Sequence, residues 1–305
     1  MTAADRPLPP ALPGERHTIA TSPAGALSYY RSAGQGGPPV LLAHSINAAG
    51  SAYEMKPLYE AYQAKRPVYA LDLPGFGFSE RSDRVYTPRL MTDAIHAMVD
   101  AIRKAHDNVP IDAAALSLSC EFLARAISER PEHYRSAALI SPTGFDKKAP
   151  YNEPPGTTRA MPWLYRFFTV PLWTRPLYKG LTARRTIRFF LEKTWGSKNI
   201  DEGLLDYDYK TTHQPGARFA PYYFVSGYLF SRDITRVYEK LLLPVWMSHG
   251  NRGDFQDYSY AAQFEQRPNW TVTKFDSGAL PFFEVGDAFT RRYDAFLAQA
   301  SQRAA

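Results

Sequence analysis

Ser117 lies directly after a short apolar run, residues 111–116, and before a segment whose apolar residues recur at helical spacing. A serine between a strand and a helix can act as a nucleophile when a sharp, strained turn exposes its hydroxyl. Such a turn needs small residues two positions before and after the nucleophile, and Ala115 and Ser119 meet this need. A nucleophile at Ser119 would instead put the bulky Glu121 at a crowded position. The other interpretation is that these serines only cap the helix.

Three further motifs flank this turn along the chain. A His-Ser-Ile-Asn turn occupies residues 44–47, and an Asp-Leu-Pro-Gly-Phe-Gly-Phe-Ser loop occupies residues 72–79, with glycines where left-handed or close-packed backbone is expected. A Ser-Pro-Thr-Gly turn follows at residues 141–144. In this order, the four motifs resemble those of the α/β-hydrolase superfamily.

The resemblance implies an oxyanion hole, an acid and a histidine around the serine. The backbone N–H groups of Ile46 and Leu118 correspond to the oxyanion donors. The acid corresponds to Asp254, which could instead only cap the helix that follows. Asp146 is the fallback acid, because some members of the superfamily place theirs there, and Asp257 is a lesser alternative.

An alanine occupies the position of the expected histidine. The family pattern Gly-His-x-Pro-x-x-Glu corresponds here to Gly-Ala-Leu-Pro-Phe-Phe-Glu, residues 278–284, so Ala279 stands in place of the histidine. No histidine follows His249. A base contributes roughly 10²–10⁴-fold to attack by a serine hydroxyl, so we expect ordinary ester hydrolysis to be severely impaired.

Three explanations of this alanine are open: replacement of a natural histidine, use of another base, or a binding or non-hydrolytic role. His44 and His249 fall at positions that the family fills with structural histidines. Glu121 is a candidate carboxylate base, but Glu121 and Arg125 have the i,i+4 spacing of an ion pair on a helix surface. His213 belongs to a loop that could reach over the site.

The spacing of apolar residues predicts the elements that position these groups. Residues 18–31 predict a hairpin, and short continuous apolar runs predict strands buried on both faces of a parallel sheet. Helical spacing alternates with these runs, so we expect an α/β fold with a doubly wound, mostly parallel sheet of the α/β-hydrolase type. The predicted strands span residues 39–43, 67–71, 111–116, 136–140, 243–247 and 271–274, and the predicted helices span residues 87–106, 119–129, 258–264 and 287–300.

A long helical interval interrupts this alternation. We predict a proline-rich leader at residues 1–17, a core formed by residues 18–146 and 243–305, and an inserted helical cap at residues 147–242. Within the cap, residues 161–191 interleave aromatic and basic side chains. Either the aromatics pack the cap onto the sheet, or they form a surface that makes weak contact with a membrane.

The resemblance and the apolar character of the cap together predict a pocket for a small hydrophobic substrate. Its predicted lining residues are His44, Ser45, Asn47, Trp163, Arg218, Tyr222 and Leu280.

The composition narrows the classes of function. The 305 residues have a formal net charge of +6 without a block of like charges, so we expect no nucleic-acid partner. The single cysteine, Cys120, excludes an intrachain disulfide, and the start of the chain lacks the apolar core of a secretory signal, so we expect a cytoplasmic protein. No motif for a metal or a dinucleotide is present, and we therefore expect neither a metal nor a cofactor.

The leading hypothesis is a serine hydrolase that acts on a carboxylic ester or a related acyl compound with an apolar body. Ser117 is the predicted nucleophile, and Ala279 is the predicted cause of impaired activity. One alternative is a non-catalytic protein that binds a hydrophobic ligand in the same pocket. Another is a lyase or isomerase that uses the oxyanion site.

Overall fold

Short apolar runs form the central strands, which are buried along their whole length. The computed structural model describes residues 7–146, 150–253 and 257–304. In β3 (Val40–Ala43), Leu41 and Ala43 belong to one apolar core while Val40 and Leu42 belong to another. This alternation is typical of a sheet with helices packed on both faces.

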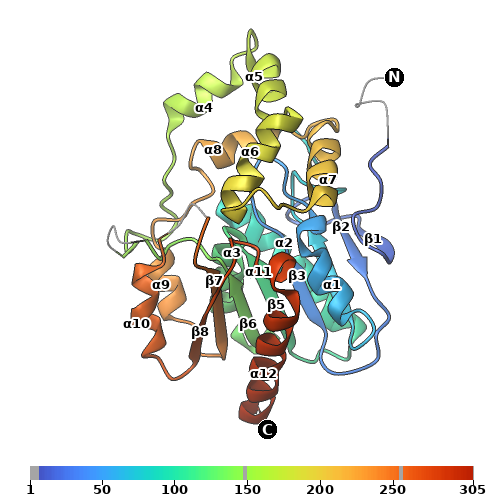
Figure 1. Ribbon diagram of the computed structural model, residues 1–305, viewed down its shortest axis with the longest axis vertical. Helices are drawn as coiled ribbons and strands as arrows, with labels where there is room; N and C mark the ends of the chain where they lie inside the picture. Colours follow the sequence, from blue (N-terminus) through green and yellow to red (C-terminus); the bar gives the residue numbers. More distant parts are fainter. Residues whose placement is uncertain (1–6, 147–149, 254–256, 305) are drawn as a thin grey trace.

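Eight strands form one sheet in the order β1-β2-β4-β3-β5-β6-β7-β8 (Figure 1). The first two strands form the predicted antiparallel hairpin, β2 pairs with β4 in antiparallel fashion, and all other pairs are parallel. The predicted doubly wound, mostly parallel sheet is therefore confirmed. The other strands are β1 (Glu15–Ile19), β2 (Leu27–Arg31), β4 (Val68–Asp72), β5 (Ile111–Leu116), β6 (Tyr134–Ile140), β7 (Val245–Gly250) and β8 (Trp270–Phe275).

Helices cover both faces of the sheet. One core takes side chains from α2 (Pro88–Ala105), α3 (Ser119–Glu129), α9 (Ile234–Glu239) and α10 (Ala262–Glu265). The other core takes side chains from α1 (Lys56–Tyr62), α11 (Pro281–Glu284) and α12 (Gly286–Ala304). The predicted helix at residues 258–264 is instead a 3₁₀ turn, Ser259–Ala261, followed by the short α10.

Five of the helices between β6 and β7 lie together toward the end of the molecule opposite the C-terminus (Figure 1). They are α4 (Pro162–Thr169), α5 (Thr174–Leu181), α6 (Arg184–Trp195), α7 (Glu202–Thr212) and α8 (Phe219–Val225). Ile187 of α6 and Leu204 of α7 join the core formed by α1 and α12, whereas Ala220 of α8 joins the core formed by α2 and α3. We call these five helices the cap.

The start of the described chain packs against both the core and the cap. Leu8 and Leu12 are buried, the Ala11 N–H donates to the Tyr30 hydroxyl at 2.8 Å, and the Tyr207 hydroxyl of α7 donates to the Pro9 carbonyl at 3.0 Å. The first strand begins within the stretch predicted as a leader. Among the described residues, no helix combines the length and apolarity needed to cross a bilayer.

A buried ionic cluster lies at the beginning of the neighbouring strands β5 and β6. Asp112 of β5 is fully buried and accepts hydrogen bonds from the guanidinium groups of Arg66 and Arg135. The Ser136 hydroxyl on the neighbouring strand donates to the same carboxylate at 2.5 Å. The carboxylate thus balances two largely buried cations.

Candidate active site

Ser117 occupies a strained turn between β5 and α3. Its φ is +55°, in the left-handed region that residues with a side chain rarely adopt. Its N–H donates to the Ile140 carbonyl at 2.8 Å, and its carbonyl accepts from the Cys120 N–H at 3.1 Å. Ser117 is partly exposed, whereas Leu116 and Leu118 beside it are buried. The structure therefore contains the predicted strand, turn and helix, with the serine as the accessible residue of the turn.

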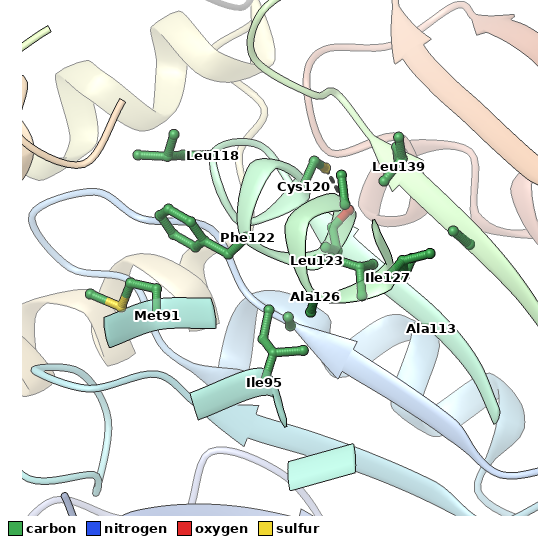
Figure 2. Close-up of a cluster of buried hydrophobic side chains, with 14 of the residues drawn as sticks. Met91, Ile95, Ala113, Leu118, Cys120, Phe122, Leu123, Ala126, Ile127 and Leu139 are labelled. Atoms are coloured by element: carbon green, nitrogen blue, oxygen red, sulfur yellow. Dashed lines mark hydrogen bonds between the residues drawn. The ribbon is translucent and has the colours of Figure 1, made fainter. Parts of the chain in front are cut away.

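Apolar packing fixes α3 beneath this turn. Figure 2 shows Phe122 and Leu123 of α3 in the buried cluster that also contains Met91 of α2. The Cys120 thiol donates to the Ala115 carbonyl at 3.1 Å. Burial raises the pKa of this thiol well above its ordinary value, so it stays protonated and does not compete as a nucleophile.

The turn at residues 44–47 is bonded to the start of α3. The Ser119 hydroxyl donates to the His44 carbonyl at 2.5 Å. The His44 ring is fully buried, with Nε2 accepting from the Leu73 N–H at 3.0 Å and Nδ1 bonding the Ser45 carbonyl at 2.6 Å. Burial lowers the pKa of His44 to about 4 and keeps the ring neutral. The His44 ring therefore supports the backbone of the two loops.

Two buried backbone donors lie on either side of this junction. In the part of the chain that the structure describes, the N–H groups of Ile46 and Leu118 donate to no protein acceptor. Buried N–H groups without acceptors are rare because they lose hydrogen bonds to water without replacement. A bound oxyanion is the kind of acceptor that such a pair can hold.

Glu54, which sequence reasoning missed, holds the turn that carries Ile46. Its carboxylate accepts from the Ser45 N–H at 2.7 Å, from the Ser45 hydroxyl at 2.9 Å and from the Asn47 amide at 2.7 Å. The side-chain oxygen of Asn47, Oδ1, accepts from the Ala49 N–H at 2.6 Å. Ser45 and Asn47 thus direct polar groups into the loop framework. No motif spacing links Glu54 to this turn, so no sequence signal identifies it.

A second buried carboxylate, Asp208 of α7, lies near Glu54. It is 3% exposed, and its Oδ1 has no hydrogen-bond partner among the described residues. Burial, and then the charge of Glu54, raise the pKa of Asp208 well above its ordinary value. Ionised Asp208 therefore lowers the stability of the folded protein.

Replacement Asp208→Asn is expected to stabilise the protein by about 1–3 kcal/mol at pH 8, because it removes a buried charge without changing the side-chain shape. The folded-state pKa is raised, so the stability associated with protonated Asp208 is present at low pH and is lost as the pH rises. The gain should therefore shrink toward pH 4. Urea unfolding at both pH values measures the gain. The control is Asp206→Asn on the same helix, where the carboxylate is half-exposed and pairs with Arg184. An equal effect of the two variants at pH 8 would contradict the prediction.

The loop at residues 72–79 is organised around buried Asp72. Its carboxylate accepts from the Ala52 N–H at 2.9 Å and from the Phe78 N–H at 3.0 Å. Gly77 has a φ of +51°, and a Cβ there would overlap the Asp72 carboxylate. Burial raises the pKa of Asp72 to about 6. The expected close-packed, left-handed glycine is confirmed at this position.

The loop after β8 presents Ala279 beside the strand end that contacts Ser117. The Ala279 carbonyl accepts from the Ser141 hydroxyl at 2.7 Å, and Ser141 directly follows Ile140, whose carbonyl binds the Ser117 N–H. The Gly278 N–H donates to Glu284 at 2.6 Å. The loop that would display a histidine is thus fully formed, while its side chain at position 279 is a methyl group.

The turn after β7 is bonded to this same loop. The N–H groups of Asn251 and Arg252 both donate to the Ser277 carbonyl, at 3.0 and 3.2 Å. The Arg252 guanidinium pairs with Glu284. Asp254, the predicted acid, lies outside the described residues.

The two alternative acids have local contacts. The Asp146 carboxylate accepts from the Tyr151 hydroxyl at 2.8 Å. The Asp257 carboxylate accepts from the Ser259 N–H at 2.9 Å, at the start of the 3₁₀ turn.

The end of α6 packs against both loops through three glycines. The Thr194 carbonyl accepts from the Ala279 N–H at 3.0 Å. A Cβ at Gly278 would lie 2.5 Å from the Thr194 carbonyl oxygen, and a Cβ at Gly253 would lie 2.5 Å from the Gly196 nitrogen. Both approaches are too short for a side chain. The cap therefore contacts the predicted acid turn and the loop of Ala279 by backbone packing.

The expectation that Glu121 forms a helix-surface pair with Arg125 is wrong. Glu121 is fully buried and accepts from the Thr143 hydroxyl at 2.6 Å and from the Ser231 N–H at 2.9 Å. Arg125 instead pairs with Asp233 at 2.7 Å. Burial raises the pKa of Glu121 to about 6. These contacts join α3 to the segments on either side of the cap.

The two other candidate histidines bond to backbone carbonyls. His249 Nδ1 bonds the Gly250 carbonyl at 2.8 Å, and the ring stacks on Tyr258 with centroids 4.2 Å apart. His213 Nδ1 bonds the Tyr209 carbonyl at 2.7 Å, at the end of α7.

The remaining predicted pocket residues have different surroundings. Leu280 is buried next to Ala279, and Tyr222 is buried within the cap, where its hydroxyl bonds Thr174. The guanidinium of Arg218 lies 4.4 Å from the ring centre of Phe219. Trp163 is 68% exposed on α4.

Solved structures with this fold have several different activities. A serine hydrolase of carbazole degradation, CarC, has 14% sequence identity and a TM-score of 0.71, with 93% of this chain and 99% of that chain covered. The Cif epoxide hydrolase from Acinetobacter nosocomialis has 19% identity and a TM-score of 0.68, covering 93% and 88%. A membrane phospholipase A has 18% identity and a TM-score of 0.69, covering 94% and 86%. At these identities, the similarity shows the fold alone.

Sequence comparison assigns the family. No curated protein sequence gives a significant match. The model of the Alpha/beta hydrolase family matches residues 40–292, which include the strained turn at Ser117 and the loop of Ala279. The chain therefore belongs to the Alpha/beta hydrolase family.

Proposed function

We propose that this chain is a serine hydrolase for a carboxylic ester or related acyl compound with an apolar body, and that its activity is limited by Ala279. The observation that carries the proposal is the strained turn at Ser117 together with the bonded loop that holds Ala279 at the position of the missing base. Ser117 has the strained, partly exposed geometry of a nucleophile. The loop of residues 278–279 is held by hydrogen bonds to Ser141 and Glu284, but the side chain at position 279 is only a methyl group.

The reaction follows from these positions. The Ser117 hydroxyl oxygen attacks the acyl carbon, and the N–H groups of Ile46 and Leu118 stabilise the oxyanion. The bond to the alcohol then breaks, and water hydrolyses the acyl-enzyme. A histidine at position 279, oriented by Asp254, would take the serine proton and return it to the leaving alcohol. An alanine transfers no proton, so the first step is slow.

An apolar substrate body suits the side chains next to these groups. Ile46 and Leu118 carry the proposed oxyanion donors, and Leu280 directly follows the position of the missing base. All three are buried apolar residues. They offer no charged partner to the acyl chain, and an apolar chain gains free energy by leaving water.

Covalent trapping tests the proposal. We expect a p-nitrophenyl alkylphosphonate to label the Ala279→His variant once, at Ser117, because the added imidazole activates the hydroxyl. The unmodified protein should label on the order of 100 times more slowly or less. Intact mass and peptide mapping locate the adduct.

The control is the double variant Ala279→His, Ser117→Ala, which should not be labelled. Circular dichroism establishes that each variant is folded. A folded Ala279→His variant that is not labelled, or that is labelled at another residue, would overturn the proposal. That result would favour a protein that binds a hydrophobic ligand without hydrolysing it.

A further inference from the structure

Exposed apolar side chains are concentrated on one part of the cap. Within the described part of the chain, ten large hydrophobic residues are exposed, and seven of them fall between residues 161 and 190. Every exposed phenylalanine or tryptophan in that count belongs to this stretch. Single exposed apolar residues are ordinary, whereas a concentration of them marks an interaction surface.

The densest part of this stretch is formed by Trp163, Phe167, Leu172 and Trp173, which we call the cap tip. Trp163 and Phe167 have i,i+4 spacing on α4, so they share one face of that helix. The rings of Phe167 and Trp173 lie 5.6 Å apart, and Leu172 is 81% exposed. The interpretation that the cap aromatics pack onto the sheet fails for these residues.

The geometry of the cap tip suits an interface between water and an apolar phase. The Trp173 indole N–H donates to the Phe167 carbonyl at 2.8 Å, so the tryptophan can enter an apolar environment with its polar group already bonded. Helices α4 and α5 lie at the end of the molecule farthest from the C-terminus (Figure 1). The cap tip is therefore unobstructed by the core.

Basic residues predominate around the cap tip, and two of them, Arg184 and Arg188, pair with Asp206 and Glu202 of α7. Residues 161–200 contain eight lysines and arginines and one acidic residue, Glu192, so this segment carries +7, more than the +6 of the whole chain. Arg166, Arg175, Lys179 and Arg185 are exposed. The rest of the chain has a net charge of −1, so the net positive charge of the protein resides in this segment.

We propose that the cap tip docks on the surface of an anionic lipid bilayer. The apolar side chains enter the interface, and the surrounding cations contact the headgroups. A second copy of the chain is disfavoured because it would bring two strongly positive segments together. A nucleic acid is disfavoured because a phosphate backbone gives Leu172 no apolar surroundings. This inference goes beyond the proposed hydrolysis and does not depend on it.

Vesicle sedimentation tests the docking. We expect the unmodified protein to bind vesicles of phosphatidylcholine with 30% phosphatidylserine and not vesicles of phosphatidylcholine alone. Binding should fall sharply between 0.05 and 0.5 M NaCl, because salt screens exposed charges. Leu172→Ser should weaken binding about tenfold, and the double replacement of Arg175 and Lys179 by glutamine should weaken it about 25-fold.

Matched control variants distinguish specific docking from nonspecific adsorption to vesicles. Leu242→Ser removes a similarly exposed leucine, 86% exposed, and Lys240→Gln removes an exposed cation. Both residues lie outside the five cap helices, so neither replacement should change binding. Equal binding to neutral vesicles, or equal effects of Leu172→Ser and Leu242→Ser, would overturn the proposal. So would a dimer in sedimentation velocity that Leu172→Ser dissociates, or tighter binding to single-stranded DNA that Leu172→Ser leaves unchanged.

Discussion

The Ala279→His variant is expected to hydrolyse p-nitrophenyl esters about 10²–10⁴ times faster than the unmodified protein, because a general base contributes a factor of this size to serine acylation. The bonds that would orient the ring are already present: Gly278 is held by Glu284, and the carbonyl of residue 279 is held by Ser141. The kcat/KM values for a series of acyl chain lengths measure the gain, which should be larger for hexanoate than for acetate if the substrate body is apolar.

The effects of Ser117 and of residue 279 should not be additive. Groups that act as a unit lose most of their effect when any one is missing, so Ser117→Ala should change the rate of the unmodified protein little. In the Ala279→His background, the same replacement should remove the whole gain. A gain that survives Ser117→Ala would show that the new histidine acts without the serine and would contradict the assignment of the nucleophile.

The Asp112→Ala variant is expected to lose about 3–5 kcal/mol of unfolding free energy, because it leaves two buried guanidinium groups without their common anion. Arg66 and Arg135 are each at most 12% exposed as side chains, so water cannot replace the carboxylate. Urea unfolding measures the loss.

An exposed ion pair supplies the control for this variant. Asp100 pairs with Arg130 at 3.0 Å, with side chains 53% and 42% exposed. Asp100→Ala should therefore cost less than about 1 kcal/mol. Similar losses for the two aspartate variants would show that the buried cluster contributes no more than a surface pair. If Asp112→Ala does not fold, Asp112→Asn, which keeps the shape and part of the hydrogen bonding, should fold with a smaller loss.

The sheet and the strained turn were predictable because their signals are local. Continuous apolar runs predict buried strands, and the small residues Ala115 and Ser119 around Ser117 predict a tight turn. Both follow from the sterics of a few neighbouring residues. The predicted strands and the turn therefore correspond to elements of the structure.

The polar framework of the site was not predictable because its partners are distant in sequence. Arg125, four residues after Glu121, is a suitable partner by spacing. Glu121 instead accepts from the Ser231 N–H, 110 residues away, because the segment that follows the cap covers that face of α3. Asp208 comes from the cap to lie near Glu54 for the same reason. Rules of residue spacing describe an isolated helix. They cannot predict which face of that helix a segment inserted later in the chain will cover.

The glycine contacts at the end of α6 limit how this protein can change over evolution. Gly196 in the cap and Gly253 in the core each fill the space that a side chain on the other would need, and Gly278 does the same against Thr194. A larger residue at one position cannot be accommodated by a change at that position alone. The cap is therefore not a freely exchangeable module, and a chimera that takes its cap from a relative must retain a matching backbone contact at this junction to keep the loop of residue 279 in place.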